Sequence, residues 1–221
     1  MPVAEVIQSL KKLSDPARID GMKRYGIDTS KAIGVAIPDV RRLARSYKKD
    51  QELSLKLWAT GIHEARILAS IIGDPAQVTE KQMDAWTKEF NSWDVCDQVC
   101  GNLFDRTPFA VDKAFEYSKH EEEYIKRAGF VLMAELAVHA KNMDNEVFLS
   151  FFPVMEREAN DNRNFVKKAV NWALRQIGKR NSILQKAAVE TAKRMLKQDS
   201  KAAKWIATDA LKELENRVLK K

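Results

Sequence analysis

The chain has 221 residues, and its 38 lysines and arginines against 31 aspartates and glutamates give a formal net charge of +7. That length suits one extended domain or two small ones, and we predict a single domain over residues 1–221. The moderate basic excess favours an anionic partner, nucleic acid or an acidic membrane surface, but does not choose between them. No apolar run approaches the length needed to cross a bilayer. Two cysteines and no signal-peptide pattern at the N-terminus indicate a reducing, cytoplasmic compartment.

Apolar residues recur at helical spacing along nearly the whole chain, and no alternating run predicts a strand, so we expect an all-α fold. Proline and capping residues predict where several helices begin. Glycines predict where others end, although one of them, Gly101, fits a close packing contact within a helix equally well. In chain order, the start signals are Asp15-Pro16, Ile37-Pro38, Asp74-Pro75 leading to a cap at Thr79, and Thr107-Pro108, and the stop signals are Gly73, Gly101 and Gly178.

A weak repeat appears when the more regular helical segments are aligned. Residues 64–69, 126–131, 167–172 and 201–206 each place a charged residue ahead of alanine and large apolar residues. Ala128, Ala169 and Ala203 are separated by 41 and 34 residues, near the roughly 40–47 of HEAT and armadillo repeats. The pattern predicts an α-solenoid of HEAT-like helical repeats, a curved superhelix with a basic concave groove. Ordinary helical packing without a groove is the alternative.

Trp93 and Asp97 stand four residues apart, and on a helix this spacing points an indole and a carboxylate the same way. A site that recognises a cationic base needs both groups. A second tryptophan, Trp172, lies in another helical segment, rich in lysine and arginine. The alternatives are that both indoles pack in a core and that Asp97 is a cap or a surface carboxylate, with Asp94 an adjacent competitor for its role.

Several longer pieces of the sequence resemble one family, the AlkD-type DNA alkylation repair glycosylases, which are built from HEAT-like repeats and excise alkylated purines. The most specific pieces are Trp-Asp-x-x-Asp at residues 93–97 and Trp-x-Leu-Arg at residues 172–175. The resemblance covers most of the chain. The matching segments are residues 22–27, 34–44, 63–66, 93–97, 126–128 and 168–175.

The resemblance implies roles for five residues. Asp97 takes the position of the catalytic aspartate, and Trp93 and Trp172 take those of tryptophans that contact the lesion nucleotide. Arg127 corresponds to an active-site arginine, for which pairing with a nearby glutamate is the alternative. Tyr25 corresponds to an aromatic residue near the same cleft. The family is known for holding the duplex backbone and leaving the lesion outside a deep pocket.

Candidate phosphate contacts follow from helical spacing. Lys168 and Arg175 are seven residues apart and share a helix face that Lys179 continues, so we expect all three to contact DNA phosphates. Arg42 and Arg66 are further candidates at the opposite end of the chain. None of these implies a code for reading bases, which suits a repair protein that acts in any sequence context.

The chemistry is consistent with this interpretation. Alkylation at N3 or N7 makes a purine a cationic leaving group, and cleavage of its glycosidic bond passes through an oxocarbenium-like sugar. A carboxylate, ionised at neutral pH, stabilises that sugar and orients a water molecule. Indole faces add a cation–π attraction of about 0.5–2 kcal/mol. We expect no cofactor and no metal, because the histidines lack ligand spacing, and we expect Cys96 and Cys100 to be buried and structural.

We therefore predict a monofunctional alkylpurine DNA glycosylase of base excision repair. Its expected partner is double-stranded DNA containing alkylated bases, with no membrane, and the chain is expected to be a monomer that is cytoplasmic and nucleoid-associated when bound to DNA. Two other functions stay open. The first is a noncatalytic HEAT-repeat protein that binds damaged or structured DNA. The second is a helical-repeat adaptor for another protein, which would present an exposed apolar patch in place of a basic groove.

Overall fold

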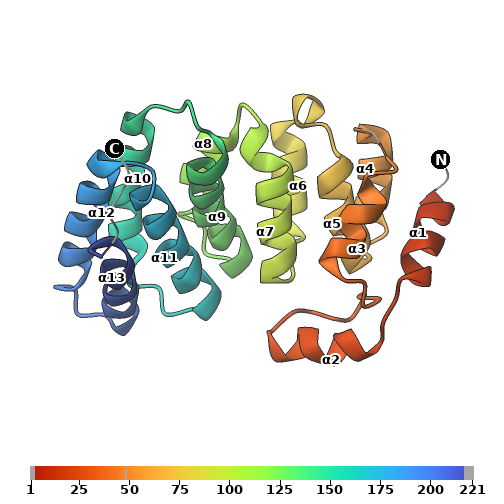
Figure 1. Ribbon diagram of the computed structural model, residues 1–221, viewed down its shortest axis with the longest axis horizontal. Helices are drawn as coiled ribbons and strands as arrows, with labels where there is room; N and C mark the ends of the chain where they lie inside the picture. Colours follow the sequence, from red (N-terminus) through yellow and green to blue (C-terminus); the bar gives the residue numbers. More distant parts are fainter. Residues whose placement is uncertain (1–2, 48, 217–221) are drawn as a thin grey trace. The chain divides into compact units, whose positions relative to one another are not determined.

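The computed structural model describes residues 3–47 and 49–216, and every regular element within these ranges is helical (Figure 1). The all-α prediction is confirmed. Contacts between residues group the chain into two compact units, Met1–Thr107 and Pro108–Lys221. Each unit has its own buried apolar side chains. The single domain expected over residues 1–221 stays a prediction.

Unit 1 packs around the helix α5 (His63–Ile72). This helix contacts α1 (Val3–Lys12), α3 (Ile37–Ala44), α4 (Gln51–Ala59) and α7 (Trp93–Asn102). Ala65, Ile67, Leu68 and Ala69 of this helix are fully buried, so α5 is the centre of the unit. Figure 1 shows α2 lying across the direction of α3 to α7, and no residue of α2 is buried. The other elements are α1 (Val3–Lys12), α2 (Ala17–Arg24), α3 (Ile37–Ala44), α4 (Gln51–Ala59), η1 (Pro75–Gln77), α6 (Glu80–Lys88), α7 (Trp93–Asn102) and η2 (Phe104–Arg106).

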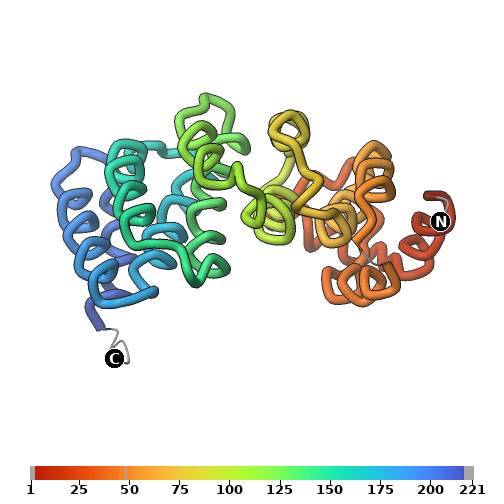
Figure 2. Tube along the Cα trace, turned by 90° about the horizontal axis from the view of Figure 1, so that it is seen from above, coloured from red at the N-terminus to blue at the C-terminus, as the bar shows by residue number. Residues whose placement is uncertain are grey.

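Unit 2 is a succession of helical pairs, which Figure 2 follows along the Cα trace. Its helices are α8 (Ala110–Tyr117), α9 (Glu123–His139), α10 (Asn145–Glu158), α11 (Asn164–Gly178), α12 (Ser182–Met195) and α13 (Lys201–Leu214). Helix α9 packs on α11, and α11 packs on α13, while α10 packs on α12. The repeat segments 126–131, 167–172 and 201–206 thus lie in three helices that pack one after another. The weak sequence repeat corresponds to a structural repeat in this unit.

Most of the predicted helix boundaries are confirmed. Pro16 is the N-cap of α2, Pro38 is the second residue of α3, and the Thr79 hydroxyl caps α6 by accepting from the Gln82 amide at 3.1 Å. Helix α8 begins two residues after Pro108. Gly73 is the C-cap of α5, and Gly178 is the last residue of α11. Gly101 is different: it is buried inside the last turn of α7, as the packing alternative requires.

The five tryptophans separate into core and surface residues. Trp58 and Trp86 are buried in unit 1, where their rings stack with centroids 4.1 Å apart. Trp93 and Trp172 are half-buried, and 41% of Trp205 is exposed. The packing alternative concerned Trp93 and Trp172, and neither of them is fully buried. Part of each residue, like part of Trp205, reaches the surface.

A helix that crosses a membrane must be both long and apolar. No helix between residues 3 and 47 or between residues 49 and 216 combines the length and the apolar composition that a transmembrane segment requires.

Candidate functional site

Helix α7 divides its residues between the core and the surface of unit 1. Val95, Cys96 and Cys100 are fully buried, whereas Trp93 and Asp97 are only half-buried. The four-residue spacing places the indole and the carboxylate on the same side of the helix, one turn apart. Both cysteines lie on the buried side of the helix, so the expectation that they are buried is confirmed. The helix holds its apolar face inward and leaves the Trp93–Asp97 face accessible.

The Trp93 ring is fixed by a hydrogen bond to the backbone of Tyr25. Its indole N–H donates to the Tyr25 carbonyl oxygen at 2.9 Å, and Tyr25 is the C-cap of α2. The side chain of Tyr25 is 73% exposed. The sequence predicts that Tyr25 and Trp93 share a site. The structure brings them together through the Tyr25 carbonyl and the Trp93 ring.

The loop that follows Tyr25 is anchored by a buried carboxylate at the start of α5. Glu64 is 1% exposed, and its two oxygens accept hydrogen bonds from the backbone N–H groups of Ile33, Gly34 and Val35, at 3.0, 2.7 and 3.1 Å. Gly34 has φ +81°, and an added Cβ would collide with the carbonyl of Asp15. Glycine is required at this point, because a side chain meets both backbone strain and a clash.

A second buried contact fixes the N-terminus of α7 to α5. The Nε2 atom of His63 lies 2.9 Å from Oδ2 of Asp94, and the two side chains are 4% and 13% exposed. Burial lowers the pKa of His63, but the Asp94 hydrogen bond and the negative charges of Asp94, Glu64 and Asp28 outweigh it and raise the pKa above the ordinary value. Asp94, the adjacent competitor for the role of Asp97, thus holds the helix in place.

Arg66 packs inside unit 1. It forms an ion pair with the Glu89 carboxylate, donates to the Glu89 carbonyl at 3.0 Å, and lies over the Trp58 ring, with the guanidinium carbon 4.6 Å from the ring centroid. Only 13% of its side chain is exposed. These contacts give Arg66 a structural role, and its predicted contact with a phosphate stays a prediction.

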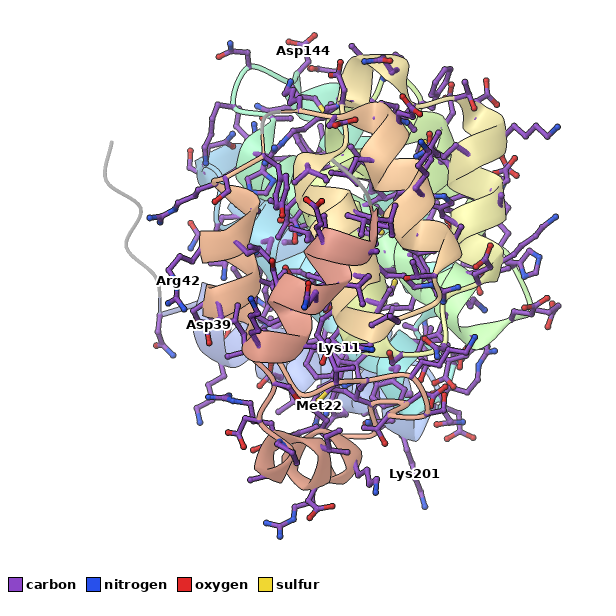
Figure 3. All side chains as sticks on the ribbon, turned by 90° about the vertical axis from the view of Figure 1, so that its right-hand side faces the viewer. Lys11, Met22, Asp39, Arg42, Asp144 and Lys201 are labelled. Atoms are coloured by element: carbon purple, nitrogen blue, oxygen red, sulfur yellow. The ribbon has the colours of Figure 1, made fainter. Side chains whose placement is uncertain are left out.

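Two neighbouring arginines of α3 have different surroundings. Arg42 is exposed and pairs with Asp39 on the same helix at 2.7 Å (Figure 3). Arg41 reaches α7 instead, where its guanidinium donates to Oε1 of Gln98 at 2.9 Å. Gln98 adjoins Asp97 in the chain, so Arg41 is a cation near the candidate catalytic helix that the sequence reasoning missed. Helical spacing alone did not distinguish it from Arg42.

In unit 2, helix α11 bears the predicted cations Lys168 and Arg175, with Trp172 between them, and Lys179 is the C-cap of the helix. Lys168 is exposed, and Trp172, Arg175 and Lys179 are half-buried. Arg175 lies 2.8 Å from Oε2 of Glu213, and Lys179 lies 3.1 Å from Oε1 of the same carboxylate. Within residues 49–216, Lys168 has no acidic partner. A phosphate contacting Arg175 or Lys179 would compete with Glu213.

Arg127 is buried, with 5% of its surface exposed, and its Nη1 donates to the carbonyl of Phe165 at 2.5 Å. Phe165 is in the first turn of α11, so Arg127 ties α9 to the beginning of the helix that bears Trp172. The neighbouring Lys126 pairs with Glu158 at 2.7 Å and Asp161 at 3.2 Å. The role of Arg127 in binding a lesion stays a prediction.

Residues that the sequence reasoning did not assign do much of the positioning. His63 and Glu64 lie in the matched segment 63–66 but received no role. Their partners stand about 30 residues away in the chain, at the start of α7 and in the loop before α3. The one local signal was Gly34, because a glycine between apolar residues indicates a close backbone approach.

Comparison with known proteins agrees with the resemblance seen in the sequence. Residues 6–214 match a family model described as DNA alkylation repair enzyme. A solved structure described as "a new family of proteins related to the HEAT-like repeat DNA glycosylases with affinity for branched DNA structures" superposes with a TM-score of 0.79 and 24% identity. The match covers 95% of this chain and 94% of the other, which confirms the HEAT-like repeat fold. No curated protein matches the chain.

Proposed function

We propose a base-excising activity for this chain, which belongs to the DNA alkylation repair enzyme family. The reaction is hydrolysis of the N-glycosidic bond of cationic N3- or N7-alkylated purines in double-stranded DNA. The observation that supports it best is the accessible face of α7. There a carboxylate, Asp97, follows one turn after an indole whose orientation is fixed by the Tyr25 carbonyl.

The roles follow from the chemistry of the bond. An alkylated purine departs as a neutral base, and its departure leaves positive charge on the deoxyribose. The Asp97 carboxylate stabilises this charge and orients a water molecule toward the anomeric carbon, where the proton released by the water goes to the carboxylate or to solvent. The Trp93 ring, held by its N–H, offers a π face to the cationic base or sugar. Normal bases are poorer leaving groups and gain less from both residues.

Unit 2 has candidate DNA-binding residues of its own. Trp172 is half-buried and makes no hydrogen bond or ring contact in the described part of the chain, so its indole is available to a ligand. Lys168 stands one turn before it, exposed and without an acidic partner among those residues. In this proposal Lys168 contacts phosphate directly, and Arg175 and Lys179 do so by exchanging the Glu213 carboxylate for a phosphate.

Release of free methylpurine from methylated duplex DNA tests the activity. We expect Asp97→Asn to lower the rate of release at least a hundredfold, in the range reported for loss of one preorganised electrostatic contact, while duplex affinity changes little. Asp112→Asn is the matched control, since Asp112 is an exposed carboxylate on α8. Equal rates for wild type and Asp97→Asn would remove Asp97 from the mechanism.

A noncatalytic DNA-structure binder is the second candidate. The observation that favours it is the description of the solved relative, which has affinity for branched DNA structures. Salt-sensitive binding of a four-way junction by the wild type, without release of any base from methylated DNA, would select this function over the first.

A further inference from the structure

The stripe on α11 that bears Trp172 is repeated on the next helix of the same row. On α11 the stripe comprises residues 168, 172, 175 and 179, and on α13 the exposed or half-exposed positions 201, 205, 208 and 212 have the same spacing. A shift of 33 residues superimposes lysine on lysine at both ends of the stripe and Trp172 on Trp205. Nothing in the proposed reaction uses the second stripe.

Trp205 is an unusual side chain for the surface of a helix. It is 41% exposed, while its neighbours Ile206 and Ala207 are fully buried. Asn171 donates to the Ile206 carbonyl at 3.2 Å, which fixes α13 against α11 beside Trp172. The ammonium of Lys167 on α11 lies 4.9 Å from the Trp205 ring centroid. The Trp205 ring therefore lies on the surface with the Lys167 ammonium beside it.

Basic residues surround the ring. Lys201 stands one turn before it and extends away from the ribbon (Figure 3), and Lys212 follows two turns after it. Neither has an acidic partner within residues 49–216. Lys204 lies 3.8 Å from Asp199, a weak exposed contact. The acidic residues of α13, Asp209 and Glu213, pair with Arg175 of α11 and with Lys179, the C-cap of α11.

We propose that Trp205, with Lys167, Lys201 and Lys204, is a second DNA-binding site that stacks an unpaired base of single-stranded DNA. Any base can stack on an indole, and the adjacent phosphates then meet the lysines, so such a surface is tolerant of sequence. Inside a duplex both faces of a base are covered by its neighbours, so the site discriminates in favour of an unpaired nucleotide. An apolar partner would need apolar neighbours around Trp205, and the stripe offers lysines and a threonine instead.

The inference rests on DNA being the ligand of the proposed function and adds a second, structure-selective contact to it. Anisotropy of a fluorescein-labelled 15-mer of thymidine measures single-strand affinity, and a blunt duplex of 15 base pairs measures duplex affinity. We expect Trp205→Ala to weaken binding of the 15-mer about tenfold, the loss expected for one base–aromatic stack. Duplex binding should stay within twofold, and Trp205→Phe should retain most of the single-strand affinity.

Ile183→Ala is the control, because Ile183 is an apolar side chain, 59% exposed, on the neighbouring helix α12. The proposal is overturned if the wild type does not bind the 15-mer, if Trp205→Ala binds it as the wild type does, or if both DNAs lose affinity equally. Competition by an acidic peptide as effective as that of unlabelled 15-mer would also overturn it. Base release from methylated duplex is scored separately. A Trp205-dependent single-strand affinity without base release would therefore reject the proposed activity and keep this site.

Discussion

Substituting glutamine for Glu64 tests whether one buried carboxylate organises the approach to α7. The wild-type side chain accepts from three consecutive backbone N–H groups, of Ile33, Gly34 and Val35. Glutamine keeps a single acceptor oxygen and turns an amide N–H toward the N–H of Ile33. Two donors then face each other in a site that is 1% exposed in the wild type.

The cost follows from these three bonds. A hydrogen bond to a charged group contributes about 1.5–3 kcal/mol, and a neutral one about 1 kcal/mol. The Ile33 N–H keeps a longer contact of 3.2 Å to Oε1 but loses the shorter one to Oε2. That loss, the weaker bonds to the uncharged oxygen and the two facing donors together should lower the unfolding free energy by about 3 kcal/mol. At about 1.4 kcal/mol per factor of ten, the equilibrium constant for unfolding rises about a hundredfold.

Urea denaturation measures this loss, and hydrogen exchange at the amides of residues 33–35 locates it. Glu52→Gln is the matched control, since Glu52 is an exposed residue of unit 1 that pairs with Lys56 on its own helix. Such surface pairs contribute about 0–1 kcal/mol. A loss below about 0.5 kcal/mol in Glu64→Gln, with unchanged exchange at these amides, would refute the reasoning that the carboxylate anchors the loop.

Two further predictions concern a buried histidine and a cluster of charges. Protonated His63 is favoured in the folded chain, so its stabilisation is complete below the unfolded pKa of about 6.5 and is lost as the pH rises through the raised folded pKa. Urea denaturation from pH 6 to pH 8.5 should show stability falling in the wild type and a smaller fall in His63→Gln, and equal slopes would count against the assignment. Glu213→Gln removes the carboxylate that pairs with both Arg175 and Lys179, while Asp209 remains 3.5 Å from Arg175. We expect anisotropy to show tighter duplex binding with a steeper salt dependence. Unchanged affinity would mean that Lys179, which pairs with no other carboxylate of the described residues, does not meet phosphate.

Much of the fold was predictable because its causes are local. Helical periodicity, a proline at the second position of α3 and the threonine cap of α6 act over a few residues, and each appears where the sequence places it. The pairing of helices was predictable from the repeat. Gly101 left two interpretations open, because a glycine in the last turn of a helix and one just beyond it have the same local pattern.

The surroundings of the candidate site were harder to predict, because they depend on residues distant in sequence. Helical spacing correctly grouped Lys168, Arg175 and Lys179, but nothing in that segment indicated that Glu213, 38 residues beyond Arg175, neutralises two of them. The same holds for Arg66, whose partner Glu89 stands on the far side of α6 in the chain. Charge pattern on one helix predicts a face. It does not predict the net charge of that face once the neighbouring helix has packed.

This difference changes how phosphate contacts should be ranked along the chain. A cation without an acidic partner, such as Lys168 or Lys201, can bind phosphate with loss of its own hydration alone. A cation that already holds a carboxylate, such as Arg175, must break that contact first. Its contribution to the free energy of DNA binding is only the difference between a phosphate partner and a carboxylate partner. The exposed lysines of α11 and α13 should therefore contribute more to DNA affinity than Arg175, which pairs with Glu213. The cations that already form an ion pair with a carboxylate are then the least available to the nucleic acid.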